Sequence, residues 1–190
     1  MQCIAKAPDF IRRTKAVHEG LIIDPTLLFE MRANYEALKC VVVEFRDLLL
    51  ALERKLVPEA SRSFLDPHMQ RYTLHQRLYG LTLVVGIILN FVLASLDDVY
   101  NLHQLHVESD EFVRGILSIW RNIANYKPIG STCLQLYLYI AWLGTSDPAL
   151  RHEIKEAVNE LEGEFTIGKL PKSAYTEDMV NFWNPVRSNM

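Results

Sequence analysis

The chain has 190 residues, of which 49% are hydrophobic and 23% charged, so it can bury a core and is not a disordered chain. Its formal charge of −3 and isoelectric point near 6.1 provide no general attraction to nucleic acid or to an anionic membrane surface. With only 8 glycines and 8 prolines the sequence has few turn signals, which favours helices over strands. We expect an all-α bundle of about six helices in one domain over residues 1–168, with a tail at 169–190 that is docked or partly flexible.

The first two predicted helices span residues 8–18 and 25–57. Gly20 stops the first, and Asp24 followed by a proline caps the second. In the second helix, apolar residues recur every three or four positions from Leu28 to Leu56, a spacing that suits a homodimeric coiled coil or the inside of a bundle. Further apolar residues widen this face, which favours packing within the same chain.

The third predicted helix, residues 67–96, follows a second Asp-Pro pair and contains an uncharged run at 78–96. That run is long enough to cross a membrane, so a single-pass membrane protein anchored there is an alternative. Thr82, Asn90 and two glycines inside the run favour instead the central helix of a bundle.

Residues 97–108 are predicted as a polar loop, after which Ser109 caps a helix that ends at the turn 127–130. An apolar core helix follows at 132–143. A surface helix at 148–165 starts from the third Asp-Pro pair, Asp147-Pro148. In the tail, residues 176–178 are a candidate cap for a short turn that carries Phe182 and Trp183.

The only cluster with metal-ligand residue types combines His103 and His106 with nearby acids. Because the glutamate of a His-Glu-x-x-His motif is absent, a solvated polar loop is the favoured interpretation and we predict no metal site. A small enzyme or metal protein that uses these two histidines is the alternative. His68 and His75 are interpreted as surface or partly buried histidines. The acids of the cluster are Asp97, Asp98, Glu108, Asp110 and Glu111.

No nucleophile, dinucleotide or nucleotide motif occurs, so we predict no enzyme activity, no catalytic residue and no cofactor. Cys3, Cys40 and Cys133 have no metal or disulfide spacing and are expected to be buried free thiols. Four aromatic residues suit either the core or the lining of a small-molecule pocket, the core being the commoner role of such spacing: Tyr126, Tyr137, Tyr139 and Trp142.

The run 125–131, Asn-Tyr-Lys-Pro-Ile-Gly-Ser, leads into an apolar helix, a break with Asp-Pro and a charged helix that ends near Phe165. In order and spacing, this run and the upstream segments resemble the C-terminal regulatory region of fungal zinc-cluster transcription factors over residues 8–165. The upstream segments are Phe10 to Ala16 with its Arg-Arg pair, the long helix after Asp24-Pro25, and the stretch from Arg77 to Asp97.

The resemblance implies a helical regulatory domain, a nuclear role in transcription control and no enzyme activity. The six-cysteine zinc cluster and the basic linker of that family are absent, so none of its metal or DNA-contacting residues has a counterpart here. We therefore expect a regulatory or interaction module that meets a protein partner or a small-molecule effector and makes no direct contact with nucleic acid. It is expected in the nucleus, or in the cytoplasm if the chain acts alone.

Overall fold

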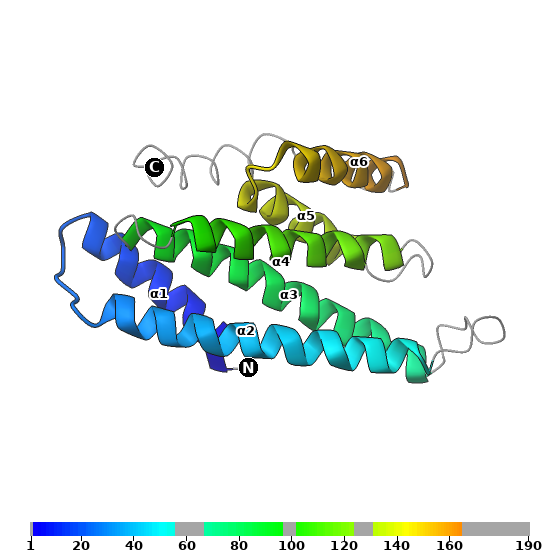
Figure 1. The fold of residues 1–190 in the computed structure, drawn as a ribbon, viewed down its shortest axis with the longest axis horizontal. Coiled ribbons are helices and arrows are strands. Elements are labelled where there is room, and N and C mark those ends of the chain that lie inside the picture. The colour runs from blue at the N-terminus through cyan, green and yellow to red at the C-terminus, as the bar shows by residue number, and fades with distance from the viewer. Residues whose placement is uncertain (1, 56–66, 97–101, 124–130, 165–190) are drawn as a thin grey trace.

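The computed structural model describes residues 2–55, 67–96, 102–123 and 131–164, and these form six α-helices and no strand, which confirms the predicted all-α bundle. The predicted tail at 169–190 lies outside the described residues. Figure 1 shows the helices packed lengthwise, with α1 and α2 on one side of α3 and α4, and α5 and α6 on the other. The helices are α1 (Gln2–His18), α2 (Leu27–Glu53), α3 (Pro67–Leu96), α4 (Leu102–Ile123), α5 (Ser131–Gly144) and α6 (Pro148–Glu164).

Helix α1 begins earlier than its sequence predicts. The expected start was Pro8, but the helix runs from Gln2 and includes that proline. The reason is a row of buried residues at intervals of three and four, on a helix that packs against α2 and α3. Burial of this row outweighs the missing N–H of Pro8. The row consists of Cys3, Ala7, Phe10 and Thr14.

The apolar seam of α2 packs inside the chain, as the bundle interpretation predicts. Met31 and Leu38 are fully buried, whereas Val42, Phe45 and Leu49 farther along are only partly buried. At the far end Leu52 joins a small second cluster with Met69 and Tyr72 of α3. The second half of α2 is therefore covered by fewer helices than the first half.

The predicted loop at 97–108 is wrong in its second part, because α4 starts at Leu102. Ser109, expected as the helix cap, lies inside α4, is buried, and donates a 2.7 Å hydrogen bond to the carbonyl oxygen of Gly144. Leu105, Ser109 and Phe112 follow one another at helical spacing, so the inward face of this helix extends toward its N-terminus. Residues 97–101 lie outside the described part.

Helix α3 is the centre of the bundle and packs against α1, α2, α4 and α5. Glycines let its neighbours approach closely. A Cβ atom on Gly80 would lie 2.4 Å from Cε2 of Tyr137, and one on Gly86 would lie 2.7 Å from Cε2 of Phe112. These contacts press α5 and α4 directly onto the backbone of α3.

The local signals at α6 and after α1 act as predicted, whereas α2 starts at Leu27 and not at Pro25 and ends at Glu53. Asp24 accepts a hydrogen bond from the backbone N–H of Leu27 at 3.1 Å, and Asp147 accepts one from that of Ala149 at 2.8 Å. Gly20 follows α1 with φ of 69°, a conformation that costs glycine little. The Asp66 cap lies outside the described residues.

Candidate functional site

The turn between α1 and α2 combines a firm backbone with exposed apolar side chains. The N–H of Gly20 donates to the carbonyl oxygen of Val17 at 3.0 Å, and the N–H of Leu21 donates to that of Ala16 at 2.9 Å. This pair of bonds is a Schellman motif. In that motif the residue after the glycine commonly packs back on its helix, but Leu21 is 70% exposed.

Arg13 of α1 forms hydrogen bonds with carboxylates at the start of α2. Its guanidinium donates to Asp24 and to Glu30 at 2.8 Å each, and it lies 3.7 Å from Asp9. Hydrogen bonds from Arg13 hold the pKa of Asp24 and the pKa of Glu30 below their usual values. One cation thus ties together the two helices on either side of the turn.

The side chains that this turn presents are large and apolar. Ile23 is 96% exposed, Phe29 in the first turn of α2 is 78% exposed, and Ile22 is 42% exposed. With Leu21 they form what we call the tip patch, at the end of the bundle where α1 turns into α2 (Figure 1). Full burial of one such side chain stabilises by about 1.5–3 kcal/mol, so covering this patch would release considerable free energy.

A second feature, a polar cluster, joins α2, α3 and α4 between their apolar faces. Glu108 accepts hydrogen bonds from Tyr35 at 2.8 Å, from Lys39 at 3.0 Å and from Gln104 at 2.9 Å. Burial raises the pKa of Glu108, but these bonds outweigh it, and its pKa lies below the usual value. Nearby, Asn90 donates to the carbonyl oxygen of Leu105 at 3.1 Å. Its Oδ1 is the one buried side-chain oxygen or nitrogen without a partner among the described residues.

The polar cluster contains Glu108, which the sequence analysis grouped with His103 and His106 as residue types that bind metals. Glu108 faces Tyr35 and Lys39, whereas His103 and His106 are exposed on α4. Within residues 2–55, 67–96, 102–123 and 131–164, no three or more His, Cys, Asp or Glu side chains are grouped to hold a metal ion. The described members of this candidate cluster are therefore not grouped as metal ligands, and Asp97 and Asp98 lie outside the described residues.

The other sequence candidates are also separated. His68 is exposed and His75 is partly buried on α3, as expected. Of the cysteines only Cys3 is buried. The prediction of three buried thiols is therefore wrong, because Cys40 lies on the outer face of α2 and Cys133 is exposed in the first turn of α5.

The aromatic residues do not converge on one place. Tyr137 is buried against Gly80 and donates a 3.0 Å hydrogen bond to the carbonyl oxygen of Arg77. Trp142 lies at the surface, 5.1 Å from the guanidinium of Arg151, and Tyr139 is partly buried. Tyr126 lies outside the described residues. The tyrosines that the structure describes act mainly in packing.

Helix α3 is, in the described part of the chain, the one helix long and apolar enough to cross a membrane. Of the most apolar stretch of 18 residues in this helix, 67% is buried inside the protein. This burial favours the interpretation as the core helix of a bundle over the alternative of a membrane anchor.

Comparisons of this chain with protein-family models, with curated proteins and with solved structures find no match. The description of the site therefore rests on the geometry of the chain itself. Among the described residues, the tip patch holds the three most exposed large apolar side chains, Ile23, Phe29 and Leu21, beside a turn held by Arg13 and by two backbone hydrogen bonds.

Proposed function

We propose that this chain is a regulatory or interaction module of a fungal transcription regulator that binds other proteins and does not contact DNA. The observation that carries the proposal is the tip patch: four large apolar side chains are exposed on a turn held by Arg13. Exposed apolar groups on an ordered backbone are typical of protein-binding surfaces, since little conformational entropy is lost when they bind.

Two further points support a protein partner over nucleic acid. The formal charge of the chain is −3, and the cations around the turn are largely neutralised by carboxylates, as Arg13 is by Asp24 and Glu30. A surface of this kind lacks the unbalanced positive charge that phosphate contacts require. The fungal and nuclear parts of the proposal come from the resemblance of residues 8–165 to the C-terminal regulatory region of fungal zinc-cluster transcription factors.

The test places the chain next to a promoter through a foreign DNA-binding domain fused to it, in a fungal cell that carries a reporter gene. We expect the fusion to change reporter expression, and the variant Leu21→Ser/Ile23→Ser to lose most of that change. The matched control is Leu136→Ser, which alters a leucine 52% exposed on α5. A fusion without effect on the reporter, or a tip variant as active as the parent, would refute the proposal.

A second measurement concerns DNA directly. The purified chain alone is expected to show no sequence-specific DNA binding at moderate salt. Specific binding whose affinity falls steeply with salt concentration would contradict the proposal, because it would reveal phosphate contacts made by this chain.

A further inference from the structure

Helix α1 covers one side of the α2–α3 pair, but only along part of its length. On α2, Met31 accepts a hydrogen bond from Thr14 of α1 at 3.8 Å, and Asn34 donates to the carbonyl oxygen of Cys3 at 3.0 Å. On α3, Ser95 lies 3.3 Å from the ring of His18. These contacts identify the face of each helix that α1 packs against.

Both faces continue beyond α1 at unbroken helical spacing. On α2, positions 34, 41 and 48 lie at intervals of seven, with Phe45 between the last two. On α3, the steps of three and four from Ser95 pass through positions 92, 88 and 85 and continue to the apolar positions 81, 78 and 74. We call these six residues the α2–α3 strip: Val41, Phe45 and Leu48 on α2, with Leu74, Leu78 and Leu81 on α3.

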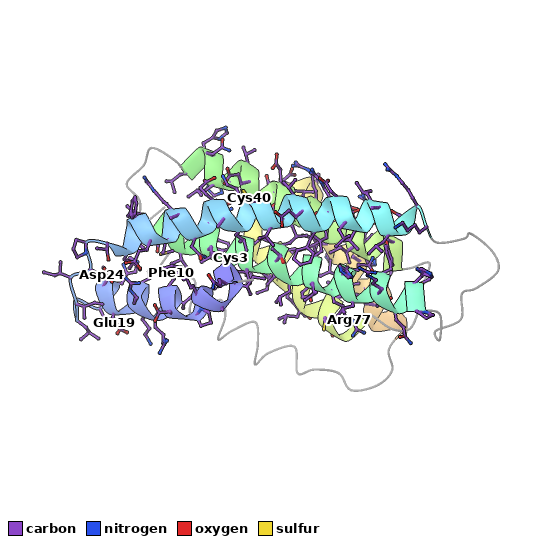
Figure 2. The ribbon with its side chains drawn as sticks, turned by 90° about the horizontal axis from the view of Figure 1, so that it is seen from below. Cys3, Phe10, Glu19, Asp24, Cys40 and Arg77 are labelled. Atoms are coloured by element: carbon purple, nitrogen blue, oxygen red, sulfur yellow. The ribbon has the colours of Figure 1, made fainter. Side chains whose placement is uncertain are left out.

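Exposure changes along this row where α1 ends. Val92 and Val85 are 4% and 7% exposed, whereas Leu81 is 38% and Leu74 is 54% exposed. Figure 2 shows the same arrangement, with Cys3 in the first turn of α1 and Arg77 farther along α3, past the end of that helix. Among the described residues, the strip is thus the uncovered continuation of a helix-packing surface that α1 already occupies.

The charges beside the strip differ between its two edges. Helix α3 contains no Asp or Glu from Pro67 to Leu96, and it carries the exposed Arg71 one turn before Leu74. On α2, Arg46 and Asp47 form a 3.5 Å ion pair, and Glu44 is exposed. The α3 edge is therefore basic and the α2 edge is not.

We propose that the α2–α3 strip binds an amphipathic helix of a partner protein, with its apolar seam on the leucines and acidic residues on the side that faces α3. The faces of α2 and α3 that pack against α1 continue into the strip, and Arg71 provides positive charge beside it for the acidic residues of the partner. A second copy of this chain is the competing occupant, and the sedimentation measurement below tests for it.

The test uses the full chain and two fluorescent synthetic helices, each of about three heptads with leucine at the seam. In one peptide the positions beside the seam are glutamate, and in the other they are lysine. We expect the glutamate peptide to bind saturably, with fluorescence anisotropy as the readout. We expect the lysine peptide to bind roughly tenfold more weakly at low salt, the difference shrinking as salt is added.

Variants locate the binding. We expect Leu74→Gln/Leu81→Gln to lower the affinity for the glutamate peptide at least tenfold. We expect Arg71→Glu to remove the preference for the glutamate peptide over the lysine peptide. Leu136→Gln, an exposed leucine on α5, is the matched control and should bind as the parent does. Circular dichroism confirms that each variant is folded.

Three results of the binding assay would overturn the proposal: no saturable binding of the glutamate peptide, equal binding of the two peptides, or an equal loss with Leu136→Gln. Sedimentation that shows a dimer which Leu74→Gln/Leu81→Gln dissociates would overturn it in favour of a second copy. The strip shares no residue with the tip patch, so failure here is distinguishable from failure of the proposed function.

Discussion

The glycine at position 80 offers a sharp test of how α3 packs. Replacing Gly80 with alanine places a methyl group 2.4 Å and 2.8 Å from two ring carbons of Tyr137, and 3.3 Å from Cδ1 of Ile119. The ring cannot move aside freely, because Tyr137 is 6% exposed and its hydroxyl donates to the carbonyl oxygen of Arg77 at 3.0 Å. The substitution therefore forces either overlap or loss of that hydrogen bond.

Two opposing effects decide the magnitude. Overpacking by one methyl group costs about 1–3 kcal/mol, and loss of a buried hydrogen bond costs about 1 kcal/mol more. Alanine gains about 1 kcal/mol over glycine inside a helix. We expect Gly80→Ala to lower the free energy of unfolding by about 1–3 kcal/mol, which lowers the melting temperature by about 2–12 °C for a chain of this size.

The assay is urea unfolding followed by circular dichroism, with Leu81→Ala, at the neighbouring exposed position, as the control. Adding Tyr137→Leu to Gly80→Ala should recover part of the lost stability, because the smaller side chain leaves room for the methyl group. A neutral or stabilising Gly80→Ala would refute the packing, since helix propensity alone predicts a gain. That result would agree better with α3 as an isolated membrane helix.

Three further substitutions test other parts of the structure. Ile87→Ala, at a fully buried position of α3, should lower the free energy of unfolding by about 2–5 kcal/mol in the same urea assay. Glu108→Gln should reduce stability at neutral pH and flatten the decline of stability in acid. The folded state lowers the pKa of the Glu108 carboxyl, so this group stabilises the fold at pH values above its usual pKa of 4.5. That contribution is lost as the pH falls through the folded pKa. Urea midpoints measured between about pH 7 and pH 3 check this, and a decline as steep as in the parent would contradict it. Arg13→Gln should speed thermolysin cleavage in the turn 19–26, whereas Arg12→Gln, whose side chain bonds Asp9 on its own helix, should not.

Local signals predicted the helix ends that depend on neighbouring residues. Asp24, Asp147 and Gly20 act within four residues of where they stand in the chain, so their roles follow from the sequence. The starts of α1 and α4 were missed, because burial of Cys3 against the bundle and the bond from Ser109 to α5 depend on distant segments. Such tertiary contacts override helix-start signals.

The candidate sites were less predictable than the fold. The partners of Glu108 are Tyr35 and Lys39, which precede it by about seventy positions, and no local pattern reveals this pairing. For the tip patch a signal existed: three aliphatic residues directly after a glycine helix stop fall outside any apolar helix face. Their exposure could have been expected, but the fastening by Arg13 could not.

The position of α1 has a consequence for motion in this bundle. Its buried row contains a single large apolar side chain, Phe10, whereas α3 buries many. We therefore expect detachment of α1 from α2 and α3 to cost less free energy than global unfolding, so that α1 opens as a cooperative unit of its own. In hydrogen exchange the amides of α1 should open through this partial unfolding and exchange earlier than those of α3, while the remaining helices keep their protection.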